Sequence, residues 1–332
     1  MTTNVHRRLL TVAALLAALT LAACGGGDDN DSSSDGGSNT PSASDKAQNR
    51  KDMARLIKQA YGPNDKASSG RLDGTIDLEV KGVPRYKGPI EVTASGGFEL
   101  PDGAESPEFR MDVGLVLNDH AIGGELVLAG GDGFIQLGTT GYKLPESITA
   151  KIEAPASALD NGLVKTAGMF FIRPDRWERN GRIVGDETVE GVVTEHAKAE
   201  IRPGRFFEDV ARLVRLLTML RVTEAVGIPQ AVTPAQRAAL GRSVESASGE
   251  VWVGKEDHIL RKAHLEGKLA VAKKDRKVLG GMTSATLTAE VFIREVGAPQ
   301  NIKGPGTLGR YADLQLALDA LGESIRNELR GK

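Results

Sequence analysis

The chain has 332 residues, and its 42 Lys and Arg against 44 Asp and Glu give a formal net charge of −2 at pH 7. This balance excludes the basic stripe of a nucleic-acid-binding protein, so we expect no nucleic-acid partner. Aromatic residues make up only 4% of the chain, whereas Gly occurs 40 times. The apolar content is therefore mainly aliphatic.

The first residues have the order of a bacterial export signal. A basic segment (6–8) precedes an apolar run (9–20) with the length of a signal-peptide core, and the tetrapeptide Leu-Ala-Ala-Cys then ends at Cys24. This tetrapeptide fits the lipobox, in which small residues precede a cysteine that accepts a diacylglycerol. We predict a lipoprotein signal peptide over residues 1–23 and lipid attachment at Cys24. An ordinary signal peptide with a stray cysteine is the alternative, but this single cysteine has no disulfide partner in the chain.

A polar segment follows the cysteine. Residues 24–45 are built mainly from Gly, Asp, Ser, Asn and Thr. Such a segment cannot bury enough apolar surface to offset its chain entropy, so we expect a disordered tether. A flexible coil of about 20 residues has a root-mean-square reach of roughly 25 Å. We expect one folded domain over residues 46–310, held by its acylated cysteine to the membrane at the outer face of the plasma membrane, and an additional C-terminal helix over 311–332.

The first half of the folded part reads as a helix followed by a meander of strands. An amphipathic helix is expected over 46–61, where Gly62-Pro63 would end it. Alternation of apolar and polar residues predicts the strands that follow, with a bulge at Gly96-Gly97 and a hairpin turn within 130–133. The expected strands are 75–80, 90–94, 109–117, 124–129 and 134–137.

The second half mixes helices and strands. Short helices are expected over 154–166 and 174–179, and a long amphipathic helix is expected over 203–226. A strand is expected over 189–201, with Glu190-Gly191 as a turn or bulge. A helix over 234–246 with Thr233 as its N-cap, strands over 250–253, 259–271 and 282–293, and a last helix over 311–330 complete the chain.

This order predicts an α+β fold, namely a strongly curved antiparallel sheet, or half-barrel, with helices covering its concave face. A meander with one apolar face must bury that face against something, and the central helices are the available cover. Two separate domains, one for each block of strands, are the alternative arrangement.

The sequence contains no recognisable constellation for catalysis or metal binding. His258 and His264 lie six residues apart on an expected strand, which separates them by about 20 Å and prevents them from sharing a metal ion. A zinc-protease helix motif, a phosphate-binding glycine loop that ends in lysine and a nucleophile elbow are all absent from the sequence. We therefore expect no metal, no cofactor and no enzymatic activity.

Three segments, together with the lipobox and tether, carry a resemblance to a known family. They are GDGFIQLGTTGYKLP (131–145), GDETVEGVVTEHAKAEI (185–201) and GEVWVGKEDHILRKAHLEGKL (249–269). They resemble the half-barrel lipoproteins of the LolA/LppX/LprG type, which carry lipids in bacterial envelopes. The chain departs from that pattern in its long helices between 201 and 250 and in its last helix.

The resemblance implies that the protein binds and shuttles the acyl chains of a membrane lipid or glycolipid without catalysis. The aliphatic, aromatic-poor composition agrees with an apolar cavity in which such chains could lie. A normally packed core is the alternative, and the protein would then be a binding module for an envelope protein or polymer. The expected cavity residues lie on the meander and the long helix: Val113, Leu115, Leu117, Leu126, Leu128, Ile135, Leu137, Leu213, Val214 and Leu217.

Overall fold

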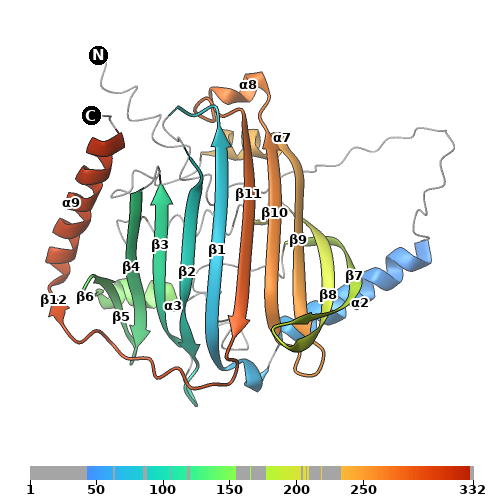
Figure 1. Cartoon of the computed structure of the whole chain (residues 1–332), viewed down its shortest axis with the longest axis horizontal. Helices are drawn as coiled ribbons and strands as arrows, with labels where there is room; N and C mark the ends of the chain where they lie inside the picture. Colours follow the sequence, from blue (N-terminus) through green and yellow to red (C-terminus); the bar gives the residue numbers. More distant parts are fainter. Residues whose placement is uncertain are drawn as a thin grey trace.

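The computed structural model shows one large sheet with helices packed against it (Figure 1). It describes residues 43–62, 64–84, 88–104, 106–117, 120–154, 165, 177–202, 205, 206, 208, 218 and 233–329. The expected signal peptide and residues 24–42 of the expected tether lie outside this range, as does most of the helix expected over 203–226.

Twelve strands form the sheet in the order β12-β6-β5-β4-β3-β2-β1-β11-β10-β9-β8-β7. Neighbouring strands are antiparallel except for β12 and β6, which pair in parallel. The predicted α+β class and the largely antiparallel sheet are thus confirmed, and the parallel pair was not expected.

The N-terminal half follows the predicted order of a helix and a meander. The elements are α2 (Ala43–Tyr61), the short 3₁₀ helix η1 (Asp65–Ala67), β1 (Ser69–Lys81), β2 (Ile90–Glu99), β3 (Glu108–Leu117), β4 (His120–Ala129), β5 (Asp132–Leu137), β6 (Thr140–Lys143) and α3 (Glu146–Glu153). Each predicted strand is present, and most of them extend further than the alternating pattern alone indicated.

The second half supplies the remaining strands and the C-terminal helix. Its elements are β7 (Glu178–Val189), β8 (Val192–Ile201), α7 (Pro234–Ser243), β9 (Val244–Gly254), β10 (Leu260–Ala270), α8 (Lys273–Arg276), β11 (Ser284–Arg294), β12 (Leu308–Gly309) and α9 (Tyr311–Leu329). The Thr233 side chain accepts a hydrogen bond from the backbone N–H of Gln236, which confirms the predicted N-cap of α7.

The two blocks of strands meet at the centre of the sheet. β1, from the first block, pairs along its length with β11, from the second, and Leu78 lies opposite Leu287. The prediction that the strands before Pro145 and those after Gly249 form one sheet is therefore confirmed. The alternative of two domains with separate sheets is wrong.

Two local expectations need correction, and one helix was not expected. Gly96-Gly97 is not a bulge, because the register of β2 is continuous with both neighbours; the glycine at 96 instead allows close approach of β3, since a Cβ there would collide with the Arg110 carbonyl. The helix expected over 174–179 is wrong at its end, where Glu178 and Arg179 pair with β8. The helix α3, which begins directly after Pro145 and ends at Glu153, was not expected, and the helix expected over 154–166 lies almost entirely outside the described residues.

The face of the sheet on which α2, α3 and α7 pack is called the inner face here, and these helices lie behind the sheet in Figure 1. Its apolar side chains form two clusters. The first cluster lies at the α7 end of the strands and joins Leu240 of α7 to Leu78 and Leu287. The second cluster lies at the other end and joins Leu56 of α2 to Phe98 and its neighbours. Alternation along the strands places polar residues on the opposite, outer face.

A C-terminal strap, residues 295–307, crosses the outer face before β12 and α9 (Figure 1). The Gln300 N–H donates to the Glu99 carboxylate (3.0 Å), and the Gly141 N–H donates to the Thr307 carbonyl (2.9 Å). The strap explains why Phe134, which faces the outer side by alternation, is only 7% exposed.

Candidate functional site

A belt of small and aliphatic residues crosses the inner face between the two clusters. It consists of two in-register rows, each with one residue from β3, β2, β1, β11, β10 and β9 in turn. The first row is Val113, Ala94, Gly74, Val291, Ala263 and Val251, and the second is Leu115, Val92, Ile76, Ala289, Leu265 and Gly249. These twelve residues are called the central belt below.

The central belt is more accessible than the strand segments on either side of it. On β3, Phe109 is 0% and Met111 is 2% exposed, but Val113 is 39% exposed. On β11, Leu287 and Ile293 are 4% and 3% exposed, whereas Ala289 and Val291 between them are only partly buried. The middle of a central strand is normally its most buried part, so this partial accessibility is unusual. The belt residues that the two clusters contact are Ile76, Leu115 and Leu265 in the first cluster and Val251 and Val291 in the second.

The dimensions and chemistry of the belt suit a hydrocarbon chain. Six strands at a spacing of about 4.8 Å extend over roughly 24 Å. One leaflet of a bilayer, half of the ~30 Å hydrocarbon core, is shorter than that. The side chains in both rows are apolar, and the Ile201 side chain lies over Gly249 at the β9 end. Such a surface can bind apolar matter by burial alone, without directional contacts.

The structure places the predicted cavity residues unequally. Val113 and Leu115 lie in the central belt, and Leu126 and Leu137 are partly buried against the second cluster. Leu128 and Ile135 are packed inside that cluster, at 3% and 9% exposure. Leu117 belongs to β3, opposite Ile90 of β2. The remaining candidates, Leu213, Val214, Leu217 and Cys24, lie outside the described residues.

Sequence reasoning missed the contribution of β1, β11, β10 and β9 to the belt. The signal was present as small residues at inner positions of otherwise aliphatic strands, such as Gly74, Ala263 and Ala289. Their significance depends on strand order, because only the pairing of β1 with β11 aligns them with Ala94 and Val113.

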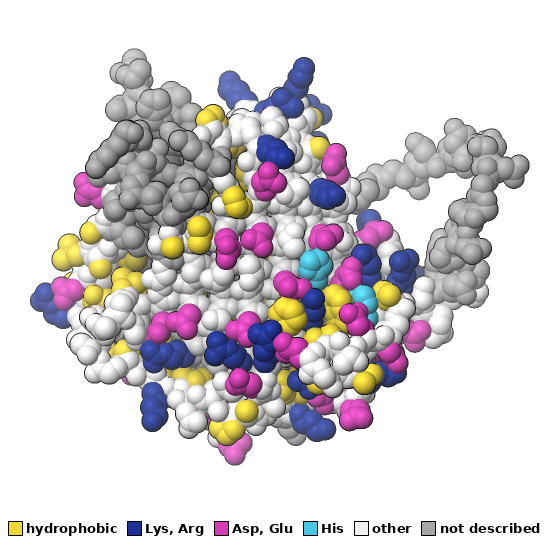
Figure 2. Space-filling view, viewed as in Figure 1, with side chains coloured by type: hydrophobic (Ala, Val, Ile, Leu, Met, Phe, Trp, Pro, Cys, Tyr) yellow, Lys and Arg dark blue, Asp and Glu magenta, His cyan; other side chains and the backbone are white. Residues whose placement is uncertain are grey.

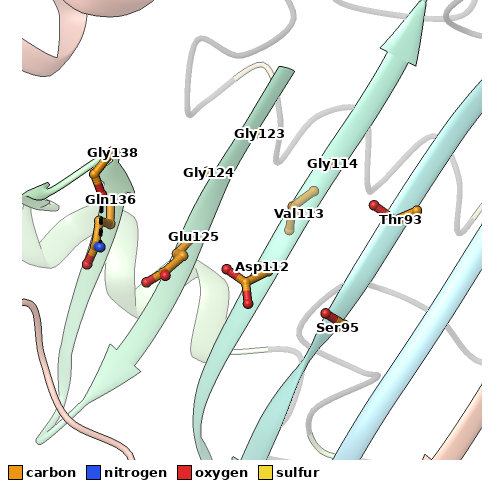
Figure 3. A pocket seen from close by; sticks show the side chains of 10 residues that line it. All are labelled: Thr93, Ser95, Asp112, Val113, Gly114, Gly123, Gly124, Glu125, Gln136 and Gly138. Carbon is orange, nitrogen blue, oxygen red and sulfur yellow. Dashed lines mark hydrogen bonds between the residues drawn. The ribbon is translucent and has the colours of Figure 1, made fainter. Parts of the chain in front are cut away.

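The outer face has a hollow of about 370 Å³ (Figure 3). Its floor includes Gly114 and Gly123, which lie directly opposite each other on β3 and β4. The side chains around it are polar: Thr93, Ser95, Asp112, Glu125 and Gln136. Glu125 is already ion-paired with Arg110. Val113 of the central belt also belongs to the lining of this hollow, but the other side chains there are polar, so the hollow lacks the apolar character expected for a lipid cavity.

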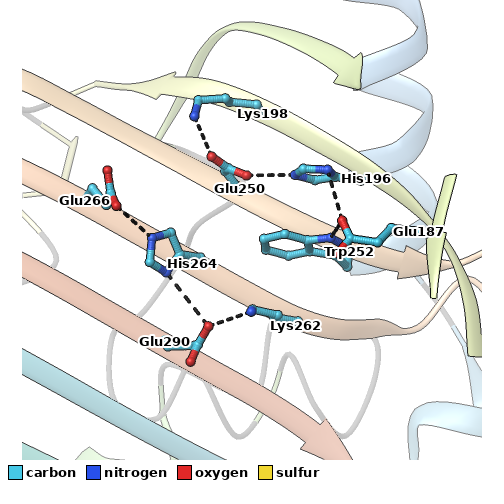
Figure 4. A network of polar contacts seen from close by, with 9 residues as sticks. All are labelled: Glu187, His196, Lys198, Glu250, Trp252, Lys262, His264, Glu266 and Glu290. Atoms are coloured by element: carbon cyan, nitrogen blue, oxygen red, sulfur yellow. Dashed lines mark hydrogen bonds and ion pairs between the residues drawn. The ribbon is translucent and has the colours of Figure 1, made fainter. Parts of the chain in front are cut away.

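A second polar feature of the outer face is a stack that crosses β8, β9, β10 and β11 (Figure 4). The His196 ring is stacked on the Trp252 ring at 4.3 Å between centroids, and the Lys262 ammonium lies 4.9 Å from the Trp252 centroid. Lys262 is also 5.0 Å from the ring of Phe292, over which Arg294 lies at 4.9 Å. The alternation of cations and rings ties four strands together.

Glu250 anchors this stack electrostatically. Its burial raises the pKa, but the hydrogen bonds from Lys198 and His196 outweigh that effect, so the pKa of Glu250 lies below its ordinary value. His196, which belongs to one of the resemblance motifs, therefore has a structural role in the described fold. Within the described residues, no three His, Cys, Asp or Glu side chains are grouped so that they could hold a metal ion.

The comparisons with known proteins give structural likeness only. No family model and no curated protein matches the chain. The solved structure of lipoprotein LppX from Mycobacterium tuberculosis matches with a TM-score of 0.37 and 12% identity, over 76% of this chain and 99% of that one. LprF from Mycobacterium bovis matches with a TM-score of 0.39 and 12% identity, over 79% of this chain and 98% of that one.

MucB, in its complex with MucA, matches with a TM-score of 0.25 and 12% identity, over 80% of this chain and 60% of that one.

Among the described residues, no helix is long and apolar enough to cross a membrane. The resemblance to the LolA/LppX/LprG type that the sequence motifs indicated is thus also found among solved structures, at similarities too low to transfer a ligand or a role to this chain.

Proposed function

We propose that this protein is a membrane-anchored envelope lipoprotein that binds and shuttles the acyl chains of a lipid or glycolipid, without catalysis. In this proposal the sheet is strongly curved, and the acyl chains lie on its concave inner face along the central belt. The observation that carries the proposal is the accessibility of the belt, since Val113 is 39% exposed whereas Phe109 and Met111, which precede it on the same face of β3, are almost fully buried.

The energetics of an acyl chain on this belt suit a carrier. Each buried CH₂ group contributes about 0.8 kcal/mol, whether it leaves water for the bilayer or for a protein surface. Transfer between bilayer and protein is therefore nearly neutral and reversible. Because the belt has no charged side chain, the polar head group of the lipid would remain outside it.

The anchor completes the proposal. Acylation of Cys24 would hold the domain at the outer face of the plasma membrane, and a lipid anchor with more than one chain is stable where a single chain is not. The polar tether would let the domain approach the bilayer and leave it again.

A second candidate function is a dry-cored module that binds an envelope protein or polymer. Two exposed apolar residues near the C-terminus favour it, namely Leu308 at 58% and Leu316 at 67% exposure. Leu316 projects from α9, the helix that departs from the family pattern, whose other face packs through Leu314 and Leu318.

Mass spectrometry of co-purified lipids separates the two candidates. The Cys24→Ala chain carries no covalent lipid, so any acyl lipid that remains after detergent-free purification is a ligand. The matched variants are Ala289→Phe, which fills the belt from β11, and Thr288→Phe, which adds the same ring to the outer face of the same strand. We expect lipid in the parent and in Thr288→Phe, and less in Ala289→Phe. Absence of lipid from the parent would favour the dry-cored module.

A further inference from the structure

The connection between β10 and β11 forms a basic tip at one end of the sheet. The tip, defined as residues 272–283, contains α8 and projects at the top of Figure 1 beyond the ends of β1 and β11. Its sequence, AKKDRKVLGGMT, holds four basic residues against one acidic residue. Figure 2 shows Lys and Arg side chains standing out from this end of the molecule.

Contacts with α7 and with the first apolar cluster fix the orientation of the tip. Asp275 is 5% exposed. Its carboxylate accepts two hydrogen bonds from the Arg242 guanidinium of α7, the shorter of which is 2.6 Å. Leu279 and Met282 are 1% and 0% exposed, and both belong to the first apolar cluster. The ion pair with Arg242 neutralises the only carboxylate of the tip.

The outward side of the tip combines positive charge with an apolar residue. Lys273, Lys274, Lys277 and Val278 are all exposed, with Val278 at 39%. The spacing of 273 to 277 and 274 to 278 places these residues on one side of a helical turn, opposite Asp275 and Leu279. Within the described part of the chain, no carboxylate forms an ion pair with the three lysines.

The charges at the opposite end of the sheet are arranged differently. There Lys255 pairs with Asp186 (2.6 Å) and Arg294 pairs with Glu190 (2.6 Å). The tip thus has a local excess of positive charge although the chain as a whole has a formal net charge of −2. A local field of this kind attracts an anionic surface within about one Debye length.

We propose that the basic tip docks on the anionic head groups of a lipid bilayer, with Val278 in the interface. The neighbouring apolar side chain favours a bilayer over a soluble polyanion, because lysines that flank an exposed valine match a surface with charged head groups above hydrocarbon. Docking would place this end of β10 and β11 toward the membrane. The inference goes beyond the acyl-chain proposal and does not depend on it, since a dry-cored lipoprotein with this tip would dock equally.

The test uses the full-length Cys24→Ser chain with one introduced cysteine, which carries an environment-sensitive fluorophore. The label is placed at Val278→Cys in one sample and at Asp102→Cys, in an exposed turn elsewhere on the surface, in the other. Both samples are mixed with vesicles of phosphatidylcholine alone or with 30 mol% phosphatidylglycerol, a composition chosen for the assay. We expect a blue shift and quenching by lipid-borne quenchers only for the label at 278 on the anionic vesicles.

Neutral variants measure the contribution of the lysines. Each basic residue near an anionic surface raises affinity about fivefold. The triple variant Lys273→Gln, Lys274→Gln and Lys277→Gln should therefore lower the association constant for the anionic vesicles, called the docking constant here, on the order of 100-fold. A matched triple variant at exposed lysines elsewhere, Lys66→Gln, Lys151→Gln and Lys303→Gln, should change it little.

Three outcomes would overturn the inference. They are an equal response of both labels, an unchanged docking constant in the tip variant, and a response of the label at 278 to a soluble polyanion as strong as its response to anionic vesicles. Acyl-lipid uptake is measured on the same variants, and unchanged uptake in the tip variant separates a failure of docking from a failure of the proposed function.

Discussion

Ala289 and Ala285 project from the same face of β11, four residues apart, yet Ala285 is 2% exposed while Ala289 is only partly buried. The strand therefore passes from a filled core into the central belt within about 13 Å. The two alanines have the same chemistry, backbone conformation and facing direction, so they form a natural pair of test positions for the space above the sheet.

Enlarging these two alanines should have unequal effects on stability. Ala285→Phe adds a ring to packed surroundings and should lower the free energy of unfolding by about 1–3 kcal/mol or more. Ala289→Phe places the same ring on the accessible belt and should change it by less than about 1 kcal/mol. Urea unfolding of both variants measures the difference. An equal cost at the two positions would mean that the belt is packed as densely as the core.

The C-terminal strap should be sensitive to a single methyl group. A Cβ at Gly141 would collide with the Pro305 ring, whereas a Cβ at Gly123 would lie 3.5 Å from the Val113 carbonyl oxygen, an ordinary contact. Gly141→Ala should therefore displace the strap and lower the free energy of unfolding by about 1–3 kcal/mol. Gly123→Ala should change that free energy by no more than about 0.5 kcal/mol. Limited proteolysis within 295–307 should accelerate only in the first variant; similar rates in both would rule out the contact.

The Glu250 network should make stability depend on pH in the acid range. The pKa of Glu250 is lower in the folded state than its ordinary value, so the folded state binds fewer protons there than the unfolded state does. The stabilisation is present above the ordinary pKa of a glutamate and is lost as the pH falls through the lowered value. Glu250→Gln should cost about 1–3 kcal/mol at pH 7, and this difference should shrink on acidification. A difference that is the same at pH 7 and at pH 3 would exclude the network as its source.

The anchor is tested by metabolic labelling with a fatty-acid analogue. Cys24→Ala removes the only thiol that could accept a diacylglycerol, so the label should be lost while the folded domain is unaffected. Circular dichroism checks the fold of the variant. Retention of the fatty-acid label by the Cys24→Ala chain would show that lipidation occurs elsewhere or that the lipobox interpretation is wrong.

Much of the sheet could be predicted from the sequence because its strands have one apolar face. Period-two alternation identified the meander, and the need to bury that face placed both blocks of strands in one sheet. The turn or bulge predicted at Glu190-Gly191 is the hairpin turn between β7 and β8, whereas most of β7, before this turn, was not predicted. Both turn residues, Glu190 and Gly191, have positive φ (49° and 84°), a conformation that Gly adopts readily and that Glu rarely adopts.

The strap and the central belt could not be predicted because both depend on contacts between distant segments. Phe134 is an apolar residue of the outer face, and its burial depends on the strap, whose Gly304 lies beside its ring. Val113 and Leu115 were expected to line a cavity, and their neighbours across β2, β1 and β11 became identifiable once the register was known. Local patterns reveal which face is apolar, whereas the remaining free space depends on how the helices cover it.

The most direct test of the central claim is equilibrium uptake of a fluorescent acyl lipid by the detergent-free Cys24→Ala chain. The parent and Thr288→Phe should bind the lipid with similar affinity and about 1:1 stoichiometry. Ala289→Phe, with its ring on the central belt, should bind at least tenfold more weakly while unfolding at a similar urea concentration. Failure of the parent to take up the lipid, or equal affinity in all three proteins, would contradict acyl-chain binding on the inner face.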